Sequence, residues 1–174
     1  MKKETADPGI DMDRVNRILL DEEYRRYLLK NKACERDRSF CHHNLEHLLA
    51  VARLTYLLLL EEKCRFISKE LAYGAGLLHD LGRWKEYREG GDHAAHSAAL
   101  AGNILKRAGF TASERELILK AIAQHRHHDP GEHRSPLSKA LSKADRFSRI
   151  CFSCDRRGDC RGLEQRPHRE KLLY

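Results

Sequence analysis

The chain has 174 residues, of which 41% are hydrophobic and 34% are charged, and its 33 basic and 26 acidic residues give a net charge of +7. This length and composition predict one domain with a hydrophobic core and give little reason to expect disorder. They exclude a collagen-like or low-complexity protein. The most apolar stretch, residues 48–60, is too short to cross a bilayer and contains Arg53, so we expect no transmembrane helix. The excess of basic residues favours anionic partners.

Apolar residues recur at the three-to-four-residue spacing of amphipathic helices along most of the chain. The predicted helices cover, in chain order, residues near 15–19, 24–36, 44–61, 68–79, 93–107, 111–125 and 137–150. No segment alternates apolar and polar residues as a half-buried strand does, and valine occurs only at Val15 and Val51. The sequence therefore predicts an all-α protein.

Residue types at the predicted helix ends support these boundaries. Asn44 suits an N-cap, Gly109 is of the type that commonly closes a helix, and Thr111 with Glu114 forms a capping-box pattern. The inward faces of these helices predict a single core, which is expected to include Val51, Leu54, Leu58, Leu71, Ala75, Leu78, Leu100, Ile118 and Ile122.

The end of the chain differs in character. Residues 151–174 are polar and arginine-rich without apolar periodicity, so we expect a helical domain over residues 1–150 followed by a short tail. Three of the six cysteines lie in this tail: Cys151, Cys154 and Cys160. In a cytosolic protein such clustering is more typical of metal binding or free thiols than of a disulfide framework. A closed zinc site needs four ligands, and Cys34, Cys41 or His168 could supply the fourth.

Two further observations concern the compartment and the loops. Residues 1–13 contain no apolar core of the kind that a secretory signal peptide has, which predicts a cytoplasmic protein. Residues 82–92 and 127–136 are expected to be loops that influence the choice of substrate. Trp84 and Tyr87 in the first of these segments could stack on a base or pack against a helix end.

The chain contains eleven histidines, and several lie on the apolar stripes of predicted helices. The histidines and aspartates at the ends of such stripes are His47, His79, Asp80, His93, His125 and Asp145. A lone histidine on an apolar face is usually a hydrogen-bonded core residue. Several together with two aspartates are typical of a metal site, because a buried carboxylate must be paired or bound to a cation. Mixed imidazole and carboxylate ligation suits iron, manganese, nickel or zinc better than calcium.

The order of these residues resembles the H…HD…D signature of the HD-domain metal-dependent phosphohydrolase superfamily. The local sequences agree: HLLAVARL begins at His47, AGLLHDLGR contains the pair His79 and Asp80, and KALSKADRFSR contains Asp145. The resemblance covers residues 40–150. It implies an all-α fold, a bound divalent metal, and hydrolysis of a phosphate ester or anhydride, often in a nucleotide.

The resemblance implies that four residues are the core metal ligands: His47, His79, Asp80 and Asp145. The segments DHAAHSAALAGNIL and AIAQHR resemble helices that carry additional ligands in some members. This implies that His93 and His125 hold a second metal or contact the substrate, with His96 as the alternative to His93. The metal would be iron, manganese, nickel, zinc, cobalt or magnesium. Arg83 is expected to contact phosphate, and His43 either reaches the same site or lies exposed near a helix end.

We therefore expect Asp80, Asp145 and Arg83 to take part in catalysis, in which a metal-activated water attacks a small-molecule phosphate such as a nucleotide. Two alternatives are a bis-nucleoside polyphosphate hydrolase with two metals and a catalytically silent module that senses a nucleotide or a metal. The positive charge also permits nucleic-acid binding by the tail, but no nucleic-acid-binding motif is present. The sequence leaves open the exact substrate, the native metal and the oligomeric state. The remaining histidines are expected at the surface: His42, His127, His128, His133 and His168.

Overall fold

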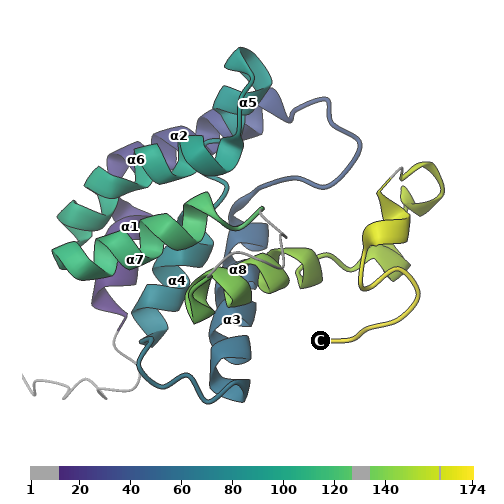
Figure 1. Ribbon diagram of the computed structural model, residues 1–174. Coiled ribbons are helices and arrows are strands. Elements are labelled where there is room, and N and C mark those ends of the chain that lie inside the picture. Colours follow the sequence, from purple (N-terminus) through teal and green to yellow (C-terminus); the bar gives the residue numbers. More distant parts are fainter. Residues whose placement is uncertain (1–11, 127–133, 161) are drawn as a thin grey trace, which may run out of the picture.

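The computed structural model describes residues 12–126, 134–160 and 162–174. Eight α-helices form in these ranges (Figure 1): α1 (Asp13–Leu20), α2 (Glu22–Cys34), α3 (Leu45–Glu61), α4 (Lys69–Leu78), α5 (Arg83–Glu89), α6 (His93–Ala108), α7 (Ala112–Ala123) and α8 (Pro136–Phe147). Three short 3₁₀ helices follow: η1 (Cys151–Ser153), η2 (Arg157–Asp159) and η3 (Leu163–Gln165). No described residue lies in a β-strand, so the predicted all-α fold is confirmed. Within the same ranges, no helix combines the length and the hydropathy that crossing a membrane requires.

Several helices begin and end where the sequence predicts, because the expected capping groups are in place. The side chain of Asn44 accepts a hydrogen bond from the backbone N–H of His47 (3.0 Å) at the start of α3. Thr111 and Glu114 form the predicted capping box at the start of α7. Gly109 closes α6 with φ of 95°, in the left-handed region that favours glycine.

The core lies where α3 packs against α4 and α8, and where α6 packs against α7. Gly76 of α4 allows a very close contact, because a Cβ atom at this position would lie 2.4 Å from the Cα atom of Ala52 on α3. Only a residue without a side chain lets the two backbones approach so closely. As a result the imidazole of His47, near the start of α3, lies 5.4 Å from that of His79, just after α4, measured between ring centroids.

Most of the predicted core is buried: Val51, Leu58, Leu71, Ala75, Leu78, Ile118 and Ile122. Leu54 and Leu100 were expected in this set, but they are only half-buried and pack against its rim. For Leu54 the reason is that the buried face of α3 is centred on Leu48, Ala52 and Leu59, which leaves Leu54 at the edge.

Residues 83–89 form helix α5, where the sequence analysis expects a loop. The only large apolar residues of the segment RWKEYRE are Trp84 and Tyr87, which are too few for a local pattern to reveal the helix. Tertiary contacts anchor the helix through Trp84, whose backbone N–H donates to Oδ1 of Asn31 (2.8 Å) and whose ring stacks on Tyr27 at 6.2 Å between centroids. Trp84 therefore packs against α2, and Tyr87 lies on the same short helix.

Two other expectations on boundaries need adjustment. Helix α2 ends at Cys34 instead of near Arg36, and α8 ends at Phe147 instead of Ile150. The second predicted loop is partly outside the described residues, since these leave out residues 127–133. Its last residue, Pro136, already begins α8.

The tail follows α8 (yellow in Figure 1) and contains 3₁₀ helices but no α-helix among its described residues. The rings of His168 and Tyr174 in the tail contact Phe147 at the end of α8. His168 was expected at the surface, but only 1% of it is exposed, and its ring contacts Phe147 edge-on with 5.2 Å between centroids. Nη1 of Arg149 donates to the carbonyl oxygen of His42 (2.7 Å). This hydrogen bond ties the loop before α3 to the end of α8, next to the tail.

Candidate metal centre

Four residues that are distant in sequence meet where α3, α4 and α8 converge. His47 lies on α3, His79 and Asp80 follow α4, and Asp145 lies on α8. Each offers one ligand atom, and these four atoms all lie within 4.8 Å of one another. Nε2 of His47 is 3.5 Å from Oδ2 of Asp80 and 3.3 Å from Oδ1 of Asp145. The structure thus brings together the four residues expected as core ligands.

A second group of three side chains shares Asp80 with the first. Asp80, His93 of α6 and His125 after α7 are all buried, and each offers a ligand atom within 4.8 Å of the others. Oδ1 of Asp80 lies 3.1 Å from Nε2 of His93 and 3.9 Å from Nε2 of His125, whereas Oδ2 faces His47 and His79. Each carboxylate oxygen of Asp80 therefore serves one group.

Backbone carbonyls orient two of the imidazoles. Nδ1 of His79 lies 2.7 Å from the carbonyl oxygen of Gly76, and Nδ1 of His125 lies 2.7 Å from that of Ile122. A carbonyl oxygen can only accept, so Nδ1 carries the proton in both rings. Their Nε2 atoms consequently face the centre, where a metal would use their lone pairs.

Side chains orient the other two imidazoles in the same way. Nδ1 of His93 lies 2.9 Å from Oε2 of Glu86, a carboxylate that accepts its proton. Nδ1 of His47 lies 3.2 Å from Oγ of Ser148, whose own proton is donated to the carbonyl oxygen of Asp145 (2.8 Å). Glu86 and Ser148 thus orient imidazoles of the centre, and no pattern in the sequence indicated either residue.

The centre contains buried polar atoms that the protein does not satisfy. Nε2 of His47, Nε2 of His79 and Oδ2 of Asp80 have no hydrogen-bond partner among the described residues. Leaving such atoms unpaired in the interior is costly. A divalent cation bound between them would satisfy all three, and imidazole with carboxylate is a ligand set that transition metals use. The residues therefore fit a divalent metal.

Charges at the centre support the same interpretation. Burial opposes ionisation of Asp80, but the positive charges of His79 and Arg83 outweigh it and hold the pKa of Asp80 well below its usual range. Burial likewise opposes ionisation of Asp145, but the adjacent imidazoles of His47 and His79 lower its pKa well below the usual range. Both carboxylates are thus charged at neutral pH, as metal ligands must be.

Two imidazoles differ in charge. Burial acts against the charged form of His79, yet the carboxylates of Asp80 and Asp145 raise its pKa to about 10. In the absence of a metal, a proton on His79 balances part of their negative charge, and a metal would displace it. Burial and the nearby positive charge of His79 lower the pKa of His125 to about 4, so this ring is neutral and free to bind a cation.

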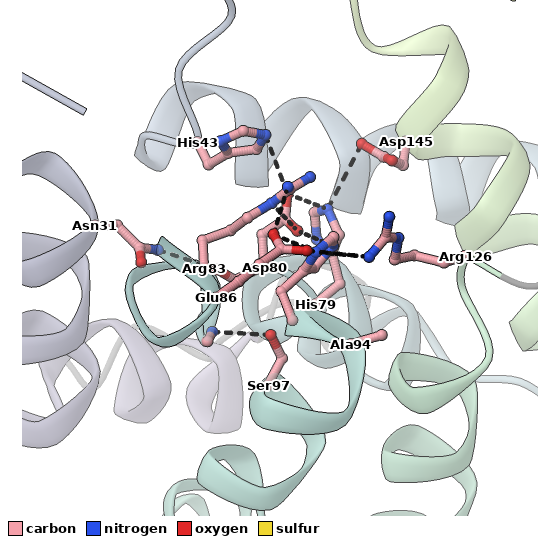
Figure 2. A network of polar contacts seen from close by, with 12 residues as sticks. Asn31, His43, His79, Asp80, Arg83, Glu86, Ala94, Ser97, Arg126 and Asp145 are labelled. Carbon is pink, nitrogen blue, oxygen red and sulfur yellow. Dashed lines mark hydrogen bonds and ion pairs between the residues drawn. The ribbon is translucent and has the colours of Figure 1, made fainter. Parts of the chain in front are cut away.

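The turn that carries His79 and Asp80 is held from two sides (Figure 2). Nδ2 of Asn31 on α2 donates to the carbonyl oxygen of Asp80 (3.0 Å), and Oγ of Ser97 on α6 accepts from the backbone N–H of Gly82 (2.8 Å). A Cβ atom on Gly82 would lie 2.5 Å from the backbone nitrogen of Ser97. The tight fit fixes where the Asp80 carboxylate points.

His43 is a further buried imidazole beside the centre. Its Nδ1 is hydrogen-bonded to the carboxylate of Glu35, and its Nε2 lies 3.8 Å from Oδ2 of Asp80. From the sequence His43 could either reach the site or lie exposed, and the structure places it at the site. The one available signal was its position one helical turn before His47. Glu35, at the end of α2, gave no signal in the sequence.

Arg83 lies at the centre, as expected, but its guanidinium is engaged. Its Nε donates to Oδ1 of Asp80 (3.1 Å) and its Nη1 donates to Oε2 of Glu86 (3.0 Å). Burial opposes its charge, but Asp80 and other acidic neighbours raise its pKa. The side chain therefore holds Asp80 in place and also borders the open space above the centre.

The structure also decides between the two histidines of α6. His93 is buried and faces Asp80, whereas Nε2 of His96 points away and bonds to the carbonyl oxygen of Gly90 (3.0 Å). His93 is therefore the one that joins the centre. His42 is exposed as expected, and His127, His128 and His133 lie outside the described residues.

Two cavities open onto the centre, with volumes of about 680 and 640 Å³. The first is bordered by His93, His125 and Arg126, and the second by Cys41 and His43. Both share a set of bordering residues: Arg83, Asp145, Gly162 and Arg166. Volumes of this size suit a small molecule.

The cysteines do not add to the centre. All six are free thiols. Within the described ranges, neither group of candidate metal ligands includes a cysteine. The metal site considered for Cys151, Cys154 and Cys160 thus gains no support from the structure.

Comparison with known proteins agrees with the geometry. The family model of the HD domain matches residues 44–150. An uncharacterized protein of Clostridium beijerinckii is 39% identical over 163 residues, which cover 94% of this chain and 100% of that protein. The crystal structure of a predicted HD superfamily hydrolase from an uncultured Thermotogales bacterium is similar, with a TM-score of 0.55 and 31% identity, over 72% of this chain and 68% of the other.

Proposed function

The chain belongs to the HD-domain family, and on that premise we propose that it is a metal-dependent phosphohydrolase. Its substrate would be a nucleotide or a related small phosphate ester or anhydride. The similar solved structure is that of a predicted HD superfamily hydrolase, which supports hydrolysis as the type of reaction.

One observation carries this proposal: imidazoles and carboxylates converge with their ligand atoms inward, and some of these atoms are buried without a hydrogen-bond partner among the described residues. Three of these atoms have no hydrogen-bond partner among the described residues, and hydrogen bonds at Nδ1 leave Nε2 of the imidazoles facing one another. A purely structural cluster would pair these groups with each other. An arrangement that leaves them open is suited to a cation.

The first metal would be held by His47, His79, Asp80 and Asp145. A bound divalent metal supplies a water acidic enough to attack phosphorus at neutral pH, and it polarises a phosphoryl oxygen. The side chains around it bind and orient the substrate, because in-line attack depends mainly on positioning and charge neutralisation.

Charged side chains of the chain itself would do this positioning. Arg83 borders both cavities while it holds the Asp80 carboxylate, so it presents positive charge to an anionic substrate. Burial lowers the pKa of His43, so this ring is neutral at pH 7 with its Nδ1 proton directed to Glu35. Its Nε2 then has a lone pair toward the centre and can accept a proton from the attacking water.

The group formed by Asp80, His93 and His125 favours a second ion or a direct contact with the substrate. Its three ligand atoms lie within 4.8 Å of one another, as the four ligand atoms of the first group do. Asp80, His93 and His125 would hold the second ion, which would supply further neutralisation of the charge on the reacting phosphate.

The experiment is to measure metal content by elemental analysis, then phosphate release from an aryl phosphate, nucleoside mono-, di- and polyphosphates and cyclic dinucleotides. Each assay is run with manganese, iron, nickel, cobalt, zinc or magnesium. We expect metal-dependent release that falls at least about a hundredfold in Asp145→Ala. His93→Ala should also lose activity, whereas His96→Ala, three residues along the same helix, should retain it.

Fully metallated protein that releases nothing from any of these compounds would contradict the enzymatic proposal. Equal activity of His93→Ala and His96→Ala would instead remove His93 from the site.

A further inference from the structure

The second cavity is built from parts of the chain that lie more than 100 residues apart. The loop before α3 contributes Phe40 and Cys41, the tail contributes Cys160 and Arg166, and Asp145 connects the cavity to the metal centre. Arg149, at the end of α8, also borders it. Arg166 lies beyond the residues that match the family model, so this wall of the cavity belongs to the tail of this chain.

Three guanidinium groups of this cavity have no carboxylate partner among the described residues: those of Arg38, Arg149 and Arg166. Arg38 is exposed and donates to the hydroxyl of Tyr87 (3.1 Å), whereas Arg149 and Arg166 are partly buried. The side chain of Arg166 makes no hydrogen bond or ion pair within these ranges, and Arg149 makes one hydrogen bond, to the carbonyl oxygen of His42. Two other arginines near the centre are paired with carboxylates: Arg83 with Asp80 and Glu86, and Arg126 with Glu86 and Asp92.

The unpaired charges are close enough to affect each other. Burial lowers the pKa of Arg149, and the positive charge of Arg166 lowers it further, despite the acidic groups of Cys41, Asp145 and Asp80. Two like charges that are partly withdrawn from water need a counter-charge.

The nearby carboxylates do not supply this counter-charge. Asp159 also borders the cavity, but it is paired with Arg156 at 3.1 Å. Asp145 borders it too, with Oδ1 directed to His47 and His79. The cavity thus has two partly buried arginines, Arg149 and Arg166, for which the described residues supply no carboxylate.

We propose that Arg149 and Arg166 form an anion subsite that binds a second phosphate group of the substrate, next to the group that reacts at the metal centre. Arginine suits this role because its planar fork donates two parallel hydrogen bonds to a phosphate. The reaction of a neighbouring phosphate at the metal centre rests on the proposed function. The anion subsite itself is inferred only from the arginines that border the cavity. The tail is then part of the binding site, and it would favour substrates with two linked phosphates over those with one.

The test is the affinity of the full-length protein for methylenediphosphonate, a diphosphate analogue that hydrolysis cannot cleave, measured by titration calorimetry with and without prior chelation of metal. We expect Arg166→Ala to weaken binding about tenfold or more under both conditions, with Arg166→Lys intermediate. Arg149→Ala should weaken it similarly. Since Arg149 also ties down the loop at His42, Arg166→Ala is the deciding variant.

The matched control is Arg169→Ala, because Arg169 lies in the same tail but pairs with Glu164 at 2.8 Å and does not border the cavity. It should bind the analogue as the unaltered protein does. Unchanged affinity of Arg166→Ala, or an equal loss in Arg169→Ala, would overturn the subsite. A single-stranded oligonucleotide that displaces the analogue, and loses its own binding in Arg166→Ala, would overturn the small-molecule assignment in favour of nucleic acid.

Activity data separate this proposal from the proposed function. If only the subsite is wrong, an aryl phosphate is hydrolysed while Arg166→Ala leaves diphosphonate binding unchanged. If only the hydrolase is wrong, no phosphate is released, and the analogue still binds through Arg166.

Discussion

The helical centre and the C-terminal tail both carry clusters of metal-binding residue types, but the fold arranges them differently. At the centre, imidazoles and carboxylates from separate helices direct their ligand atoms to one place. In the tail, Cys151, Cys154 and Cys160 are close in sequence, yet among the described residues they join no group of candidate ligands. The difference teaches that packed helices bring ligands to a common point because a core fixes their directions, whereas close spacing in sequence is not enough.

The largest effect is expected when one candidate metal-binding residue is replaced in each region. Asp80→Ala removes the carboxylate that both candidate groups share, so we expect it to abolish metal binding and hydrolysis. Cys154→Ala should leave metal content and activity unchanged. Elemental analysis of both variants, with circular dichroism to verify folding, measures the effect. Full metal content in Asp80→Ala, or its loss in Cys154→Ala, would reverse the assignment of the two regions.

A second test concerns helix packing, which the centre needs and the tail does not. In Gly76→Ala the new Cβ atom would lie 2.4 Å from the Cα atom of Ala52, so α3 and α4 must move apart. We expect a loss of about 3 kcal/mol in the free energy of unfolding, together with weaker metal binding. Chemical denaturation and metal titration measure the two effects.

The control for this packing test lies in the tail. A Cβ atom at Gly158 would meet nothing within 4 Å, so Gly158→Ala should change the free energy of unfolding by less than about 0.5 kcal/mol. If Gly76→Ala were as harmless as Gly158→Ala, the close approach of α3 and α4 would not be what positions the ligands.

The third prediction separates buried from exposed carboxylates by their response to pH. Burial opposes ionisation of Glu35, but hydrogen bonds from His43 and Tyr87 lower its pKa from 4.5 to about 2. The resulting stabilisation is complete above pH 4.5 and is lost as the pH falls toward 2, because the unfolded state binds the proton more tightly.

Glu35→Gln should therefore lower the free energy of unfolding by about 2 kcal/mol at pH 7, and the difference should shrink as the pH falls below 4. Glu164→Gln in the tail, where the carboxylate is exposed, should show no such pH dependence. Denaturant titrations at pH 3 and pH 7 compare the two variants. A difference for Glu35→Gln that persists at pH 3 would contradict the pKa assignment.

The smallest effect is expected where the tail contacts the helical domain at the surface. The hydroxyl of Tyr174 donates to Oε2 of Glu61 (2.8 Å). Tyr174→Phe removes this bond and should cost about 0.5 kcal/mol, with metal binding unaffected. A thermal melt and a metal titration are sufficient. A large loss of metal binding would mean that the tail helps to shape the centre far more than its contacts suggest.

Individual helices show which parts of the fold can be predicted from the sequence and which cannot. Helices with an apolar stripe and a capping residue, such as α3 after Asn44 and α7 after Thr111, were predictable because both signals are local. Helix α5 was not, because Trp84 becomes anchored only when α2 presents Asn31 and Tyr27 to it. The same applies to the site, where the sequence indicated His47 and Asp145 but not the residues that orient them.

The sequence by itself determined the helical class and the order of the expected ligands, because periodicity, caps and motif spacing are properties of short segments. Only the tertiary structure decided which atoms of those ligands face inward, since the partners of their Nδ1 atoms include side chains on other elements, such as Glu86 and Ser148. It also decided that Arg166 of the tail borders the same cavity as Asp145. Such contacts join segments that are distant along the chain, so no local pattern records them.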